Sequence, residues 1–222
     1  MLLRHSLKSL TNCSQFFRGI TIRLAPKEVA KTFTTVDEFL KYHGYKHVND
    51  HYTHTVYAGY DYGDTDHHFH MYPLNNAIEY ADPDLDLIEL LLKTGANPNI
   101  NTKMSLGPVL HNVLTNSNQW NDKTIPLIKL LIKYGANINL KRKGDKNTPL
   151  HRVAYAWPNS RAEEIIKVLI DNGAKINVWD GNLKTPYNNV LESHKWYQYR
   201  NFKPDKILDI LNPSLKDKYN RE

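Results

Sequence analysis

The stretch from Gly135 to Asn177 shows the pattern of apolar and polar positions most clearly. Leu150 and Ala154 lie four residues apart on one face of a predicted helix that begins at Thr148-Pro149 and stops before Pro158. A second predicted helix follows, and its apolar positions are Ile165, Ile166, Leu169 and Ile170. A stripe of this width is typical of a helix that buries one face against a neighbour. The pattern therefore predicts a helix–turn–helix unit.

Residues with capping chemistry stand at the ends of both predicted helices. The Thr148 hydroxyl can accept a free N–H of the first turn, and Pro149 sits where a missing N–H costs nothing. Ser160 and Glu163 have the spacing of a capping box, so the second helix is expected to open there. Gly173 is expected to end that helix in a left-handed conformation.

A five-residue signature, Gly-Ala-(Asn or Lys)-x-Asn, occurs three times. Its glycines are Gly95, Gly135 and Gly173, so the spacings are 40 and then 38 residues. Recurrence at such a spacing indicates a repeat architecture, in which each unit buries its apolar face by stacking on the next.

Similar units lie before and after the clearest one. Unit one starts at Tyr72-Pro73, and its second helix is expected to be capped by Asp82-Pro83. Unit two has a distorted start over 108–111. Unit four starts at Thr185-Pro186, and its second helix is predicted over 204–211 without a closing Gly-Ala signature.

The combined motifs resemble the ankyrin repeat family. The resemblance rests on the three Gly-Ala signatures and on the segments Tyr72-Pro73-Leu74-Asn75-Asn76-Ala77, Thr148-Pro149-Leu150-His151 and Thr185-Pro186-Tyr187-Asn188. It implies an all-α solenoid of stacked helix–turn–helix units with β-hairpin fingers between them. It also implies that the motif histidine hydrogen-bonds in the turn. Only His111 and His151 match that histidine, while Asn75 and Asn188 replace it, so the first and last units are degenerate.

Four segments follow from this pattern. Residues 1–34 form a basic N-terminal arm, 35–71 a His/Tyr-rich non-repeat segment, 72–212 the ankyrin repeat domain of about four units, and 213–222 a C-terminal tail. Within the second segment, the Thr35 and Glu38 capping box predicts one short helix over 36–43. The rest, 44–71, fits no repeat and is expected to be an irregular polar and aromatic loop region.

Composition limits the classes of function. The formal net charge of +6 suits acidic partners, although a Lys-rich chain also gains solubility from such a charge. The single cysteine, Cys13, excludes an internal disulfide and fits a reducing compartment. No run approaches a membrane span and no clean secretory signal is present, so we expect a soluble, cytoplasmic protein, monomeric by preference.

The first 27 residues carry basic residues with no acid before Glu28, and Leu3, Leu7 and Leu10 share a helical face. This composition resembles a mitochondrial presequence. The alternatives are a disordered arm or a helix docked on the end of the solenoid, and all three stay open.

Histidines and aspartates are concentrated in the segment 43–70. They are His43, His47, His51, His54, His67, His68, His70, Asp50, Asp61, Asp64 and Asp66. Imidazole and carboxylate groups at short spacing suit zinc or iron, so a metal-binding and even enzymatic segment is one hypothesis. No metalloprotease, thiol, catalytic-triad or phosphate-loop motif supports it, and the simpler interpretation is a set of loop histidines. No cofactor and no catalytic residue are expected.

The connections between the two helices of a unit are longer than in the family consensus, and each contains a tryptophan. These are Trp120, Trp157 and Trp196. Stacking in register would place them in a row along one edge, and exposed aromatic rows are typical interface anchors. The alternative is that each tryptophan packs on a neighbouring unit.

The second candidate surface consists of the fingers and the inner face of the first helices, which ankyrin proteins usually employ. Its candidate partner-binding residues are Asn101, Lys103, Lys141, Arg142, Lys143, Lys146, Arg152, Tyr155, Trp179, Asn182 and Lys184. A basic strip beside an aromatic suits an acidic protein surface better than nucleic acid, for which no recognition motif is present. A solvated Lys-rich loop is the alternative.

The sequence therefore predicts a non-catalytic interaction module that binds a partner protein. Small Asn/Lys/Tyr-rich proteins that resemble it occur in large DNA viruses and intracellular bacteria, where the implied role is often that of an adaptor docked on a host protein.

Overall fold

The computed structural model describes residues 33–57, 66–78, 82–101, 107–115, 117–156, 159–197 and 205–212. For residues 52–57, 66–69, 119, 196–197 and 205, only the backbone is described.

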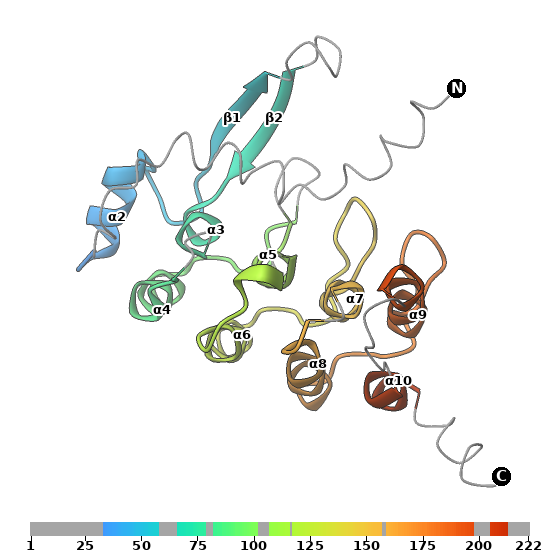
Figure 1. The fold of residues 1–222 in the computed structure, drawn as a ribbon. Helices are drawn as coiled ribbons and strands as arrows, with labels where there is room; N and C mark the ends of the chain where they lie inside the picture. Colours follow the sequence, from blue (N-terminus) through green and yellow to red (C-terminus); the bar gives the residue numbers. More distant parts are fainter. Residues whose placement is uncertain are drawn as a thin grey trace, which may run out of the picture.

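Helices arranged in pairs form the main body. The pairs are α3 (Pro73–Ile78) with α4 (Leu85–Lys93), α5 (Val109–Thr115) with α6 (Thr124–Lys133), α7 (Pro149–Tyr155) with α8 (Ala162–Asp171), and α9 (Pro186–Tyr197) with α10 (Asp205–Leu211). Figure 1 shows α3, α5, α7 and α9 in one row and α4, α6, α8 and α10 in a second row beneath it. The 3₁₀ turn η2 (Ser117–Gln119) lies between α5 and α6. The predicted helical solenoid is confirmed.

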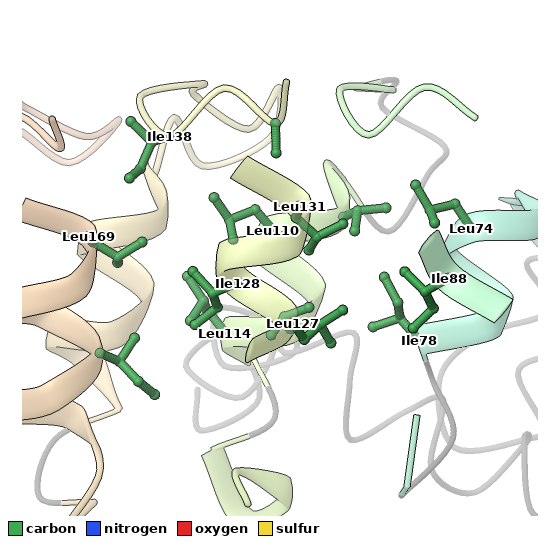
Figure 2. Packing of buried hydrophobic residues seen from close by; sticks show 14 of the residues in the cluster. Leu74, Ile78, Ile88, Leu110, Leu114, Leu127, Ile128, Leu131, Ile138 and Leu169 are labelled. Atoms are coloured by element: carbon green, nitrogen blue, oxygen red, sulfur yellow. The ribbon is translucent and has the colours of Figure 1, made fainter. Parts of the chain in front are cut away.

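The core lies between the two rows and continues from each unit into the next. Leu150 and Ala154 are fully buried, as the helical spacing predicted, and so are Ile165, Ile166 and Leu169. Figure 2 shows the same layering in the earlier units, where Leu110, Leu114, Ile128 and Leu131 point between α5 and α6. Each unit thus buries its apolar face against its neighbours, which is why a single unit would not be stable alone.

The three signature glycines end the outer helices as predicted. Gly95, Gly135 and Gly173 have φ values of 97°, 86° and 91°. In each case the glycine N–H and the following alanine N–H return to carbonyls of the last helical turn, as in Ala174 N to Leu169 O at 2.9 Å. This is the hydrogen-bond pattern of a Schellman motif, which needs a left-handed residue at the glycine position.

A ladder of asparagine side chains joins consecutive units. Asn99 donates to Gly135 O at 2.8 Å and accepts from Asn137 N at 2.7 Å. Asn139 repeats both bonds one unit later, with Gly173 O and Lys175 N. Asn99 and Asn139, the last residues of the first two signatures, therefore each satisfy two backbone groups at the end of the next unit's outer helix.

The N-terminal segment takes part in the same ladder. Asn49 donates to Gly95 O at 2.8 Å and accepts from Asn97 N at 2.7 Å. Helix α2 (Val36–His43) occupies the predicted residues, and the Thr35 hydroxyl caps it by accepting from Glu38 N. Residues 36–49 therefore stack on unit one as an outer half-unit.

The expectation of an irregular loop over 44–71 was wrong. Strands β1 (Tyr52–Tyr57) and β2 (Asp66–Met71) pair antiparallel from Tyr52 with Met71 to Tyr57 with Asp66. Figure 1 shows this hairpin projecting beside α3. Threonine, valine and tyrosine dominate β1, and such β-branched and aromatic residues favour an extended backbone.

The later fingers differ from the hairpins that the family resemblance implied. Within the described residues, paired strands occur only in β1 and β2. The finger over 140–147 is closed by Arg142 N to Asn147 O at 2.9 Å, and the finger over 178–185 by Asp180 N to Lys184 O at 2.9 Å. Both are tight turns, too short for a strand ladder.

Two predicted helix caps were misplaced. Helix α4 is capped by Asp84, whose carboxylate accepts from Asp86 N and Leu87 N, and not by Asp82. Helix α8 begins at Ala162 without a side-chain cap, because Asn159 forms a turn by accepting from Arg161 N and thereby precludes a start at Ser160. These local turns outweigh the capping-box spacing.

Candidate functional site

The candidate surface is built on the two adjacent fingers, 140–147 and 178–185. Figure 1 shows both rising on the same side, above α7 and α9. Gly181 N donates to Asp145 O at 2.9 Å, so the backbones of the two fingers touch. A Cβ at position 181 would lie 2.8 Å from that carbonyl oxygen, so only glycine permits this approach. We refer to residues 140–147 and 178–185 together as the finger pair.

Further bonds attach the preceding finger to this pair. The Asn101 side chain donates to Lys141 O at 2.8 Å and accepts from Lys143 N at 3.0 Å. The Lys141 ammonium donates to Trp179 O at 2.6 Å. Asn101, which the sequence suggested as a contact residue, thus serves to hold the fingers in register, and the surface is ordered before any partner arrives.

Three predicted contact residues of the finger pair are exposed cations, and two more predicted residues lie beside them. Lys141, Lys143 and Lys146 are exposed on the first finger. Trp179 is 57% exposed, and Asn182 is exposed on the second finger. The structure therefore brings these five together on one surface, while Lys103 lies outside the described residues.

The two predicted arginines are not part of a freely accessible basic strip. The Arg142 and Arg152 side chains are only 16% and 11% exposed, and both guanidinium groups face the Asp145 carboxylate, at 3.4 Å and 3.7 Å. Arg152 also donates to the Thr115 hydroxyl at 2.9 Å. These contacts stabilise the junction between units two and three, so both side chains are engaged within the chain and are less accessible than the sequence suggested.

Lys184 is likewise engaged within the chain. Its ammonium lies 2.7 Å from Glu192, and its carbonyl oxygen accepts from His151 Nε2 at 3.0 Å. Tyr155, at the end of α7, remains 55% exposed on the row of first helices. Of the helix-borne candidates, Tyr155 is therefore the one that can contact a partner.

The sequence analysis missed Leu183. Its side chain is 72% exposed, more than any other large apolar side chain of the described residues. Its φ of 58° lies in the left-handed region. A lone leucine between Asn182 and Lys184 in a polar loop was the available signal, because a leucine that faces solvent in a turn contributes nothing to a core.

The predicted tryptophan row is wrong for Trp120. That side chain is only 9% exposed, and its indole N–H donates to Val113 O at 3.0 Å. The lengthened connection brings the ring back to α5 of its own unit and buries it there, whereas the alternative had placed it on a neighbouring unit. Trp157 and the Trp196 side chain lie outside the described residues.

The motif histidines link neighbouring units and stay neutral. His111 Nε2 lies 2.8 Å from Asn147 O, and burial lowers the pKa of His111 to about 4. His151 Nδ1 accepts from the Thr148 N–H, so its Nε2 carries the proton donated to Lys184 O. Burial also lowers the pKa of His151. A buried imidazole that must accept at Nδ1 is suited to structure and not to proton transfer.

The N-terminal histidines do not form a metal cluster in the part of the chain that is described. His51 stacks on His70 with ring centroids 4.2 Å apart, and Tyr72 lies 5.4 Å from His51. Burial lowers the pKa of His70, and the nearby His51 adds to that effect. No group of three or more metal-ligating side chains converges among the described residues, and the side chains of His54, His67 and His68 lie outside them.

None of the described helices has the length and apolar character needed to cross a bilayer.

A family model for ankyrin repeats, in three copies, matches residues 74–180, which include units one to three and the start of the second finger. No curated protein matches the chain.

Proposed function

We propose that the chain is a non-catalytic adaptor that docks a partner protein on the finger pair and on the exposed Tyr155 of α7, because residues 74–180 match the ankyrin repeat family, whose members are generally protein–protein interaction modules. The observation that carries the proposal is the display of large apolar side chains beside unpaired cations on a rigid support. Trp179, Leu183 and Tyr155 are each more than half exposed.

The apolar component favours a protein over a small ion or a simple charged surface. Tryptophan and tyrosine bury a large area with few rotatable bonds, which is why they are common at the centres of protein interfaces. The finger pair already holds Trp179 through the Lys141 bond to its carbonyl oxygen. Little conformational entropy is then lost when a partner covers the ring.

The charge of the finger pair favours an acidic partner. Lys143 and Lys146 are exposed and form no ion pair with any carboxylate among the residues that the structure describes. Both acids of the finger pair are withdrawn from the surface, since Asp145 faces Arg142 and Asp180 is only 8% exposed. Complementary charge accelerates association and restricts the choice of partner.

The test is affinity capture by the full-length chain and by a variant that combines Trp179→Ala with Lys143→Glu. Arg142 and Lys141 are left intact because their side chains hold the fingers together. The matched control combines Tyr42→Ala with Lys129→Glu, since both residues are exposed on α2 and α6, far from the fingers in sequence. Thermal unfolding of all three proteins is measured in parallel.

We expect the finger variant to lose a specific partner that the original chain and the control variant both retain, with unchanged melting temperatures. An affinity loss of about 30-fold or more would be typical of a buried tryptophan anchor. Retention of the same partner by the finger variant would contradict docking on the finger pair.

A further inference from the structure

Two side chains of the finger pair are held in a backbone conformation that does not suit them. Lys146 and Leu183 have φ values of 59° and 58°, and they are the non-glycine residues of the described chain with positive φ. Each stands two residues before the threonine that opens the next unit, Thr148 or Thr185. The same position is therefore strained in two consecutive fingers.

Stability would favour a different residue at both positions. The left-handed region brings Cβ close to the backbone, so glycine adopts it freely and asparagine tolerates it, whereas leucine and lysine do not. The chain uses glycine nearby where a close approach demands it, at Gly181 against Asp145 O. It also uses glycine for the backbone dihedral alone, at Gly95, Gly135 and Gly173, where a Cβ would meet no other atom, but positions 146 and 183 carry side chains in the same left-handed region.

Packing within the fold does not explain why position 183 is a leucine. Leu183 is 72% exposed and is absent from the buried apolar cluster and from the residues packed against that cluster. A strained backbone with an exposed apolar side chain is the kind of local conflict that is tolerated at functional positions. The side chain of Leu183 is thus retained for a contact outside the fold.

Lys146 lies beside the finger that carries Leu183. Lys146 Cγ would be 3.6 Å from a Cβ at Gly181, so the lysine stem runs along the neighbouring finger, next to the turn that carries Leu183. Lys146 is exposed and has no carboxylate partner among the described residues. A cation and an apolar group are thereby displayed on adjacent turns.

We propose that Lys146 and Leu183 are the specificity-determining residues of the finger pair, and that they recognise a segment of the partner protein in which a carboxylate stands close to an apolar side chain. The proposal rests on the proposed docking function and adds the chemistry of the recognised segment. The segment should contain a carboxylate because of charge complementarity: the finger pair exposes lysines, whereas both of its own carboxylates are turned away from the surface.

An anionic membrane could also bind these lysines, but the finger pair is less suited to a membrane than to a protein segment. Asn182 is exposed directly beside Leu183 and would have to lose its water together with the leucine. A protein segment can leave Asn182 solvated at the rim while it covers Leu183. Membrane binding is therefore treated as an outcome that would count against the proposal.

The experiment uses the full-length chain to select random 16-residue peptides displayed on phage. Selected peptides are synthesised, and their affinities are measured for the original chain, Leu183→Gly, Lys146→Gly and Trp179→Ala. Thermal unfolding and co-sedimentation with phosphatidylserine vesicles are also measured for each protein. Leu183→Asn is a second variant that relieves the strain without adding a flexible glycine.

We expect the selected peptides to combine an acidic with an apolar residue. Leu183→Gly and Leu183→Asn should weaken binding at least 10-fold while the melting temperature rises by about 2 °C, because strain is relieved and no packing is lost. Lys146→Gly should weaken binding several-fold, and more at low salt than at high salt.

A fall in melting temperature on both leucine substitutions would show a structural role for Leu183 and overturn the inference. Peptide binding that depends on Trp179 but is indifferent to Leu183 and Lys146 would overturn the inference and leave the docking function standing. Binding to vesicles with no peptide selected would overturn both proposals.

Discussion

Units two and three contain the same buried histidine in two different settings. His151 in unit three has Thr148 three residues before it, and both the N–H and the hydroxyl of Thr148 reach His151 Nδ1, at 3.2 Å and 2.7 Å. His111 in unit two has Pro108 at that position, and Pro108 has neither group. His111 Nδ1 accordingly has no hydrogen-bond partner in the described structure.

The Nε2 side of both histidines is the same. His111 reaches Asn147 O at 2.8 Å, and His151 reaches Lys184 O at 3.0 Å, so each imidazole joins its unit to the next. In units one and four, asparagines stand at this position, and Asn75 still reaches Gly107 O at 3.4 Å. Asn188, in the last unit, instead accepts from Thr185 N at 3.0 Å at the start of its own helix. The contact with the following residues is thus kept in units one to three, whereas among the described residues unit four keeps only the bond to the helix start.

The difference shows how a repeat array tolerates a poor unit. A buried acceptor without a donor costs about 1–3 kcal/mol, yet unit two keeps its fold because its apolar neighbours Leu110 and Leu114 are 1% and 0% exposed. Stacking on both sides offsets the local deficit.

The largest expected effect on stability comes from replacing the buried histidine of either unit by alanine. His151→Ala should destabilise the chain by about 4 kcal/mol, because it leaves a cavity and removes the partners of the Thr148 N–H and Lys184 O. His111→Ala should cost about 2–3 kcal/mol, since one bond fewer is lost. Urea unfolding of both variants measures the two free energies of unfolding. Equal losses of stability would contradict the difference between units two and three.

The pH dependence of stability should come mainly from unit two. The pKa of His111 is lowered to about 4, from an ordinary value of 6.5, so between these values the unfolded chain binds the proton and the folded chain does not. Stability is then fully present above about pH 6.5 and falls as the pH drops toward 4, by on the order of 3 kcal/mol. Arg142, Arg152 and Asp145 face His111, and the two arginines oppose its protonation.

His111→Asn tests that assignment with a residue that the chain already uses in this position. The variant should retain the bond to the next unit and lose most of the slope of unfolding free energy between pH 4 and 6.5. A smaller slope should remain, because burial also lowers the pKa of His151. An unchanged slope would locate the acid sensitivity elsewhere.

Removing the threonine hydroxyl should bring unit three closer to unit two. Thr148→Val keeps the shape and the backbone N–H bond to His151 but loses the 2.7 Å hydroxyl bond, so we expect a loss of about 1 kcal/mol. Calorimetry of the variant measures it, with Thr94→Val at the exposed end of α4 as a surface control.

The smallest effect should come from repairing unit two. Pro108→Thr supplies the missing donors to His111 Nδ1, and the gain is partly offset by the greater freedom of the unfolded chain, leaving about 0.5 kcal/mol. The pKa of His111 measured by NMR is the sharper readout. It should fall further, because the new bonds stabilise the neutral imidazole. A rise in that pKa would mean that the threonine does not reach Nδ1.

Local chemistry made much of this fold predictable. The helix over 36–43, the left-handed glycines and the buried stripe of α8 all depend on residues within about five positions of one another. The β1–β2 hairpin was not predicted, because the composition of β1 favours a strand but β2 consists mainly of aspartate and histidine, which do not.

The candidate site was less predictable, because exposure depends on contacts between units. Lys143, Lys146 and Trp179 were identified as exposed finger residues. Arg142 and Arg152 looked equally available in the sequence, but Asp145 and Thr115 engage them. Trp120 is buried because its connection folds back onto α5, which no spacing rule describes.

The sequence by itself determined the repeat, the helix over 36–43 and the glycines that end the outer helices, because these follow from short-range periodicity and capping. The hydrogen-bonding role of His111 and His151 was implied only by the family resemblance. Tertiary structure alone decided which charges remain exposed. Asp145 contacts Arg142 in its own finger, Arg152 on α7 and Gly181 N on the next finger. Interactions between units select the surface that a partner can reach, since they form only when the units stack.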